Sequence, residues 1–335
     1  MADRTKKNRV KHRRLIQLFF AAASNSYVTG FATGMIYQGD LKKVCAPGLN
    51  CYSCPGALMS CPIGSLQAVL GSRSFQLSTY VFGMILAFGA LLGRMVCGFL
   101  CPFGLVQELL FKIPFVKKIK HFKGDRVLRN LKYVFLVLLV ILLPMLTKAS
   151  GDSSPYFCKY VCPAGALEAG IPYIIHEQLG TVGAAGGTGA LPAVTGLTTL
   201  PDIGNAIIKP AAIGLPAKGG ELGFLFGWKM GILAVVVLLS VMMYRPFCKY
   251  VCPLGAMYGL LNPVSLYRLR FSQDACIKCG KCARACGMCL DPTKELNHAE
   301  CVRCGDCVNV CPTDALSMGF GDGKLSQKGV LSKQA

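Results

Sequence analysis

The chain has 335 residues, of which 53% are hydrophobic and 16% are charged, with a mean hydropathy of +0.48 and a formal net charge of +20. An ordinary soluble domain rarely combines such basicity with so much apolar sequence. The Lys and Arg residues cluster beside apolar stretches and no nucleic-acid-binding motif accompanies them, so the positive-inside rule of membrane proteins explains them and a nucleic-acid partner is excluded.

The first 14 residues form a basic segment, with seven Lys or Arg, that predicts a cytoplasmic N-terminus. An apolar stretch at 15–37 follows and is interpreted as a first membrane span. Because it contains Ser24, Asn25 and Ser26, a signal peptide cleaved near Ala23 is the alternative. Both interpretations place residue 40 outside the cytoplasm.

Three further apolar stretches, at 77–96, 131–147 and 222–244, suit a hydrocarbon core of about 30 Å. The loop between the stretches at 77–96 and 131–147 is rich in Lys and Arg, as is typical of a loop retained in the cytoplasm. We therefore expect a membrane α-helical domain at 15–265 with about four transmembrane helices, in the cytoplasmic (inner) membrane, with both termini in the cytoplasm.

A Gly-rich and Ala-rich stretch at 177–221 is predicted to be an extracytoplasmic insertion. Its GAAGGTG run follows no strand pattern and precedes no helix pattern, so a flexible loop is favoured over a nucleotide site. A small α+β ferredoxin domain with two clusters is expected at 266–320, and a flexible tail at 321–335.

The membrane domain contains an internal duplication. FCKYVCPAGAL at 157–167 and FCKYVCPLGAM at 247–257 share most of their residues. The variant CYSCPGALMSCPIGSLQ at 51–67 aligns with the same C-x3-C-P-x-G motif through CPIG and keeps Cys54 further upstream. We expect two parallel repeats, at 15–114 and 131–262, that place two of these motifs on each face of the membrane.

The duplicated motifs predict two metal centres, each with four thiol ligands. On a helix, cysteines four residues apart lie one turn apart on one face, where a metal or a disulfide would both fit. The inner set is Cys97, Cys101, Cys248 and Cys252, and the outer set is Cys54, Cys61, Cys158 and Cys162. Cys45 and Cys51 are alternatives to Cys54, or they form a disulfide with each other.

The C-terminal region carries a doubled C-x2-C-x2-C-x3-C run, which is typical of two-cluster ferredoxins. In such a run the fourth cysteine of each motif binds the other cluster. One predicted set is therefore Cys276, Cys279, Cys282 and Cys311, and the other is Cys301, Cys304, Cys307 and Cys286. A zinc site fits this order poorly, and Cys289 is interpreted as a bystander rather than a ligand.

Features of other cofactor sites and of hydrolytic enzymes are absent from the sequence. The four histidines lie outside the predicted helix interiors, and no C-x2-C-H, P-loop or Ser/His/Asp set occurs. No catalytic residue is predicted, and the chain is expected to act as an electron-transfer subunit of an oxidoreductase system.

The combination of CGFLCPFG, FCKYVCPAG, FCKYVCPLG and the eight ferredoxin cysteines resembles the NapH/NosR-like membrane polyferredoxins. This resemblance implies electron transfer across or into the membrane, from a cytoplasmic donor to an extracytoplasmic reductase or flavoprotein. NosR also has a flavin-binding domain, which this chain lacks. Alternatives are a quinol dehydrogenase component that uses quinone, a redox-sensing or metal-sensing protein, and a metal-handling assembly factor.

Overall fold

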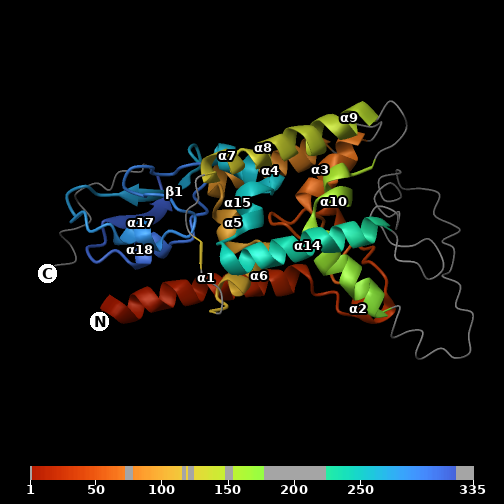
Figure 1. Ribbon diagram of the computed structural model, residues 1–335, viewed down its shortest axis with the longest axis horizontal. Helices are drawn as coiled ribbons and strands as arrows, with labels where there is room; N and C mark the ends of the chain where they lie inside the picture. The colour runs from red at the N-terminus through yellow and green to blue at the C-terminus, as the bar shows by residue number, and fades with distance from the viewer. Residues whose placement is uncertain are drawn as a thin grey trace, which may run out of the picture. The chain divides into compact units, whose positions relative to one another are not determined.

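The computed structural model describes residues 2–71, 78–114, 118–119, 124–147, 154–176 and 224–321 (Figure 1). The predicted insertion at 177–221 and the tail beyond residue 321 lie outside these residues. The chain divides into two compact units. The first comprises Met1–Ala23, Phe82–Leu136 and Val237–Ala335, and the second comprises Ser24–Val81 and Val137–Val236. Each unit therefore takes segments from both predicted repeats.

The prediction of about four transmembrane helices is wrong for the described residues. In the part of the chain that the structure describes, only α14 (Phe224–Met242) is long and apolar enough to cross a membrane. A core of about 30 Å needs about 20 helical residues, whereas the 15 residues of α4 (Ser78–Leu92) cover about 22 Å. Hydropathy identifies the apolar residues of each stretch, but it does not predict the residue at which the helix ends.

Two of the predicted spans are also interrupted. Within the stretch at 15–37, the helix α1 (Ala2–Ser24) ends at the Ser and Asn residues. Helical structure then returns only in the short α2 (Thr29–Thr33). The stretch at 131–147 is divided into α8 (Leu131–Phe135), the π-helical η3 (Leu136–Leu142) and α9 (Leu143–Thr147). Neither is one regular α-helix of spanning length, so the fold is not a bundle of four membrane-crossing helices.

In the first unit, the Cys-Pro dipeptides begin helices. α5 (Met95–Phe99) leads into α6 (Pro102–Phe111), and α15 (Pro246–Tyr250) leads into α16 (Pro253–Leu261). Proline suits the first helical position because its ring presets φ and its missing N–H would have no partner there. The preceding Cys101 and Cys252 are therefore N-cap residues, with their sulfurs at the helix N-termini.

The second unit repeats this arrangement. α3 (Pro62–Gly71) follows Cys61, and α10 (Tyr156–Tyr160) leads through Cys162 into α11 (Pro163–Gly165). The π-helical η5 (Ala166–Gly170) continues α11, and α9 packs against α3. A 3-10 turn, η1 (Asp40–Lys43), precedes the loop of residues 44–60 that carries Cys45, Cys51 and Cys54.

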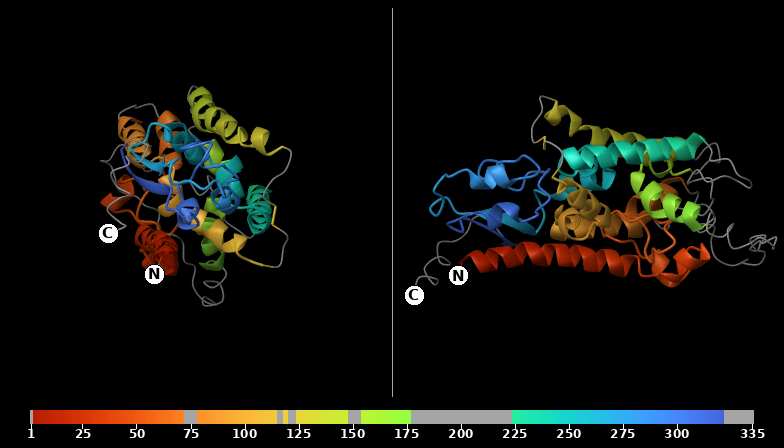
Figure 2. Two further views of the ribbon diagram at one scale, coloured as in Figure 1. Left: turned by 90° about the vertical axis from the view of Figure 1, so that its left-hand side faces the viewer. Right: turned by 60° about the horizontal axis from the view of Figure 1, so that its bottom comes forward.

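The C-terminal module of the first unit contains one two-stranded sheet and two short helices (Figure 2). β1 (Tyr267–Phe271) pairs antiparallel with β2 (Leu316–Phe320), and Leu269 stands opposite Met318. α17 (Lys281–Ala285) and α18 (Asp306–Asn309) lie between the strands in sequence. A small core of Leu269, Val308 and Leu316 holds the sheet against α18. Since this core is small, ligands to a cluster would supply much of the module's stability.

Candidate metal centres

The first predicted ferredoxin set surrounds one cavity of the C-terminal module. Cys276, Cys279 and Cys282 line it from the first motif, and Cys311 lines it from the end of the second. Burial acts against the thiolate of Cys311, but hydrogen bonds from the N–H groups of Thr313 and its neighbours hold the pKa of this thiol below its ordinary value. These donors favour the thiolate form, which is the form that binds iron.

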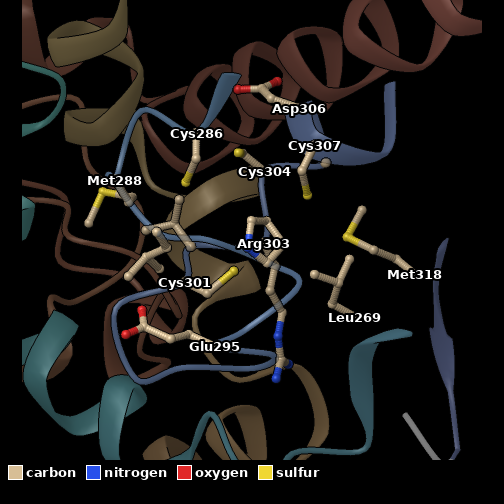
Figure 3. A pocket seen from close by; sticks show the side chains of 14 residues that line it. Leu269, Cys286, Met288, Glu295, Cys301, Arg303, Cys304, Asp306, Cys307 and Met318 are labelled. Carbon is tan, nitrogen blue, oxygen red and sulfur yellow. The ribbon is translucent and has the colours of Figure 1, made fainter. Parts of the chain in front are cut away.

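The second predicted set surrounds a separate cavity, shown in Figure 3. The sulfurs of Cys301, Cys304 and Cys307 from the second motif and of Cys286 from the first face a common space. Leu269, Met288 and Met318 supply apolar walls to the same cavity. Apolar walls around a cluster keep water from its sulfurs, which is one means by which a protein sets a reduction potential.

The two motifs share their backbone conformation as well as their spacing. Lys278 and Arg303 occupy equivalent positions and have φ of 52° and 50°, and the glycines that follow two residues later, Gly280 and Gly305, also have positive φ. Turns of this kind point successive N–H groups to one side. The side chain of Arg303 turns away from the sulfurs and donates to the carbonyl oxygens of Leu92, Asn262 and Tyr267.

The predicted inner set lies within the first unit, and all four thiols are buried. Cys97 comes from α5 and Cys248 from α15, while Cys101 and Cys252 cap α6 and α16. Burial raises the pKa of the Cys252 thiol well above its ordinary value, and negative charge on Cys248, Cys97 and Cys101 raises it further. The structure therefore brings these four thiols together, which is the condition for a shared metal cluster.

Backbone groups and buried cations surround this inner set. Gly104 and Gly255, the glycines of the two C-P-x-G motifs, each donate their N–H to the sulfur of the capping cysteine at 3.4 Å. Arg94 donates to the Cys248 carbonyl oxygen at 3.1 Å, and Arg245 donates to the Cys97 carbonyl oxygen. Both arginines are fully buried, and they are paired with carboxylates. Their charges favour thiolate ligands at this site.

A glutamine that the sequence analysis missed joins the two halves of the inner set. Gln107 donates its amide N–H to the Cys248 sulfur at 3.2 Å and accepts from the Phe247 backbone N–H at 3.2 Å. Gln107 lies on α6, six residues after Cys101. The ring of Phe247 packs edge-on against Phe103, with 5.2 Å between centroids. Gln107 thus fixes the start of α15 relative to α6.

The second unit contains the same device. Gln67, six residues after Cys61, donates to the Cys158 sulfur at 3.3 Å and accepts from the Phe157 N–H at 2.9 Å. The repeated spacing C-P-x-G-x-x-Q in CPIGSLQ and CPFGLVQ was the available signal for both glutamines. We call each assembly of C-P-x-G-x-x-Q with F-C-K-Y-V-C-P-x-G a cradle, the first in the first unit and the second in the second unit.

The second cradle gathers Cys61, Cys158 and Cys162, and the loop at 44–60 brings further thiols near it. Burial raises the pKa of the Cys158 thiol well above its ordinary value, and charge on Cys162, Cys61 and Cys51 raises it further. Cys45 is buried and hydrogen-bonds Ser65 at 3.5 Å. None of the nineteen cysteines, all of which lie in described residues, forms a disulfide.

The all-thiol donor sets fit iron–sulfur clusters. Within the described ranges, no three His, Cys, Asp or Glu side chains stand close enough to hold one metal ion. In a [4Fe–4S] cluster each thiolate binds a different iron, so the sulfurs surround a volume instead of meeting at a point. Cys289 lines neither ferredoxin cavity. The ligand sets remain predictions, and the cavities and cradles show how these cysteines would be held.

Two sequence families match the chain, and both are described as 4Fe-4S binding domains. Fer4_5 matches residues 76–123, 133–179 and 226–272, and Fer4 matches residues 295–317. The Fer4_5 matches contain both motifs of the first cradle and the FCKYVCPAG motif of the second. The Fer4 match contains the four cysteines of the second ferredoxin motif. The chain therefore binds [4Fe–4S] clusters.

Several known proteins resemble the chain. An uncharacterized protein of Methanocaldococcus jannaschii is 26% identical over 242 residues, which cover 71% of this chain and 76% of that protein. The methylamine utilization ferredoxin-type protein MauN of Paracoccus denitrificans is 37% identical over 75 residues, 21% of this chain and 26% of MauN. YccM of Escherichia coli, whose name assigns it to electron transport, is 39% identical over 57 residues, 16% of each chain. No solved structure matches the chain. The chain is thus similar to ferredoxin-type proteins of electron transport.

Proposed function

We propose that this protein carries single electrons through a series of [4Fe–4S] clusters, between a cytoplasmic donor and an acceptor in or beyond the membrane. When bound, such clusters supply one-electron redox chemistry. The chain's own residues hold the sulfurs, exclude water from them and supply the charges and hydrogen bonds that set their potentials. Donor and acceptor both come from outside this chain.

The observation that carries this proposal is the contact between two cluster-binding segments of the first unit. A Cβ atom on Gly98 would lie only 2.5 Å from the carbonyl oxygen of Val302. Gly98 directly follows Cys97 of the first cradle, and Val302 directly follows Cys301 of the second ferredoxin motif. Only glycine allows backbones to approach this closely. The segments that carry ligands of two predicted clusters are therefore in direct backbone contact.

A buried ion-pair network supports the same junction. Arg94 donates to the Cys248 carbonyl oxygen at 3.1 Å and to the Glu300 carboxylate at 2.9 Å. Lys132 is also paired with Glu300, and the exposed fraction of each of these side chains is 5% or less. Since Glu300 directly precedes Cys301, the network ties the ferredoxin motif to the first cradle. A fixed, dry junction favours electron transfer over short distances.

Exposed apolar side chains support a membrane location. α14 is long enough to span, and Phe224, Trp228 and Leu238 on it are exposed. Phe19 on α1 is 75% exposed. Exposed apolar surface of this extent is typical of contact with lipid or with a partner protein. Together with the resemblance to NapH/NosR-like polyferredoxins, it favours the inner membrane, with an extracytoplasmic reductase or flavoprotein, or quinone, as acceptor.

The test is reconstitution of the anaerobically purified chain into vesicles that contain a trapped reductant. An impermeant acceptor outside should become reduced, whereas vesicles with the Cys97→Ala/Cys248→Ala variant should reduce it only at the rate of protein-free vesicles. An acceptor that stays oxidised with the unaltered chain, at full iron and sulfide content, would remove the transmembrane route. Reduction that needs added quinone would identify quinone as the acceptor.

A further inference from the structure

The second cradle lacks a ligand that the first cradle has. Aligning CPIG at 61–64 with CPFG at 101–104 places Ala57 where Cys97 stands. The fourth thiolate of the second cradle must therefore come from a position at which the first cradle has no cysteine. The loop of residues 44–60 offers three thiols for this role, Cys45, Cys51 and Cys54.

Cys51 lies against the turn that follows Cys162. A Cβ atom on Gly165 would stand 3.7 Å from the Cys51 sulfur. Gly165 is the counterpart of Gly255, whose N–H donates to the Cys252 sulfur at 3.4 Å in the first cradle. The Cys51 sulfur therefore lies beside the turn that carries a cluster ligand in the duplicated motif.

A second contact fixes the backbone of Cys51. Its N–H donates to the Glu168 carboxylate at 2.5 Å. Glu168 lies on η5, three residues after Gly165, so both contacts come from the segment that begins at Cys162. Burial raises the pKa of the Cys51 thiol, and charge on Glu168 and then on Cys162 raises it further.

The other two thiols have different surroundings. Burial raises the pKa of the Cys54 thiol to about 11, and the side-chain charges that act most strongly on it are those of Glu168 and Lys42. Lys42 itself donates to the Ala57 carbonyl oxygen at 2.7 Å. Cys45 makes its contact with Ser65. Of the three thiols, Cys51 is the one whose sulfur lies at Gly165 and whose backbone is held by Glu168.

We infer that Cys51 completes the second cradle as the fourth thiolate ligand of a [4Fe–4S] cluster, with Cys61, Cys158 and Cys162. Glu168 and Gly165 position it. This inference replaces the predicted Cys54, and it rests on cluster binding, not on the proposed electron route. Lys229, which is buried and close to Gly165, supplies positive charge beside the four thiolates.

The test compares three single variants of the full chain, Cys51→Ala, Cys54→Ala and Cys45→Ala, purified without oxygen. Cys51→Ala should lose about four irons and four sulfides per chain and one EPR signal of the reduced protein, as the positive control Cys158→Ala should. Cys54→Ala and Cys45→Ala should keep the unaltered content and spectrum. Retained ferredoxin-domain signals in every variant will show that the rest of the chain still folds.

If Cys51→Ala does not accumulate, Cys51→Ser replaces it. A serine ligand should keep the protein folded and shift the EPR spectrum and potential of one cluster, while Cys54→Ser leaves both unchanged. Full iron with an unchanged spectrum in the Cys51 variant, or loss of a cluster in the Cys54 variant alone, would overturn the assignment. Electron transfer across vesicles would survive that outcome, so the two proposals fail separately.

Discussion

The two cradles share the hydrogen bonds of their glutamines but place different charges around their cysteines. In the first cradle, buried Arg94 and Arg245 donate to the carbonyl oxygens of Cys248 and Cys97. The aligned positions in the second cradle are Cys54 and Pro155, which carry no positive charge, so Lys229 beside Gly165 takes the place of the two arginines. In the second cradle, Glu168 also accepts from the Cys51 backbone. Duplication has kept the sulfur-holding geometry and changed the electrostatics, so we expect the first-cradle cluster to have the higher reduction potential.

The largest expected effect comes from removing one ligand of each cradle in turn. Cys248→Ala and Cys158→Ala should each abolish one cluster and reduce the iron content by about four per chain. A redox titration followed by EPR should show that Cys248→Ala loses the signal of higher potential and Cys158→Ala the signal of lower potential. The reverse order would contradict the electrostatic comparison while leaving the ligand sets intact.

The buried carboxylates should differ in their contribution to stability. Glu300→Gln leaves Arg94 and Lys132 buried without their counter-charge, which should cost about 3–5 kcal/mol in the free energy of unfolding. Burial raises the pKa of Glu168 to about 7, and a glutamine oxygen can still accept from Cys51, so Glu168→Gln should cost about 1 kcal/mol or less.

Thermal unfolding of the two variants at neutral pH measures this difference. Equal losses of stability would show that the ion pairs at Glu300 add nothing beyond a single hydrogen bond. The iron content of each variant serves as the control, since a lost cluster would lower stability for another reason.

Each cradle glutamine should raise the potential of its cluster by a smaller amount. Gln107→Met keeps the side-chain volume but removes the N–H that reaches the Cys248 sulfur. One hydrogen bond of about 0.5–1.5 kcal/mol corresponds to roughly 20–60 mV for one electron, so the potential of the first cluster should fall by that amount. Gln67→Met should shift the other cluster alone. A fall in both potentials in either variant would argue against separate cradles.

The last prediction concerns Asp125, which contacts the FCKYVC segment of the first cradle and has no counterpart contact among the described residues of the second. Burial acts to raise the pKa of Asp125, but hydrogen bonds from Lys249, Tyr250 and Arg129 outweigh burial and hold the pKa below its ordinary value. Because a lowered carboxyl pKa stabilises the folded state above the unfolded value of about 3.9, Asp125→Asn should cost about 1–3 kcal/mol, equally at about pH 5 and pH 8.

The stability difference between Asp125→Asn and the unaltered chain, measured by chemical unfolding across that pH range, checks the prediction. A difference that changes strongly between these pH values would mean that another group controls it. Lys159, the counterpart of Lys249 in the second cradle, provides the matched control, since Lys159→Met should leave the first cradle unaffected.

The cysteine sets could be proposed from the sequence because spacing alone constrains which sulfurs can converge, and as ligand sets they stay predictions. The exchange of Cys286 and Cys311 between the ferredoxin motifs was predicted from spacing, and the cavities bring those sets together. Gln67 and Gln107 could also have been predicted from the sequence, since both occur at the same position of the duplicated C-P-x-G-x-x-Q spacing. The position of Cys51 was not, because it depends on contacts with Glu168 and Gly165, which lie more than 100 residues away.

The helical part was predicted poorly for a different physical reason. Apolar content gives the tendency of a segment to leave water, but the length of a continuous helix depends on where turns and irregular hydrogen bonding interrupt it. The end of α1 at Ser24 and the π-helical η3 are such interruptions.

Arg303 has a consequence for how a redox partner must meet this protein. Its guanidinium binds carbonyl oxygens on both sides of the junction, at Leu92 and Asn262 and at Tyr267, while Asn262 donates to the His298 and Cys301 carbonyl oxygens. These hydrogen bonds join the C-terminal module to Leu92 and Asn262 of the same unit, so we expect it not to move as a tethered shuttle. A protein that donates electrons to this module would have to diffuse to it, and we expect such a donor to bind near the exposed Cys279. The rate at which electrons enter the module should accordingly depend on the frequency of collisions with the donor and on ionic strength, not on the motion of a domain.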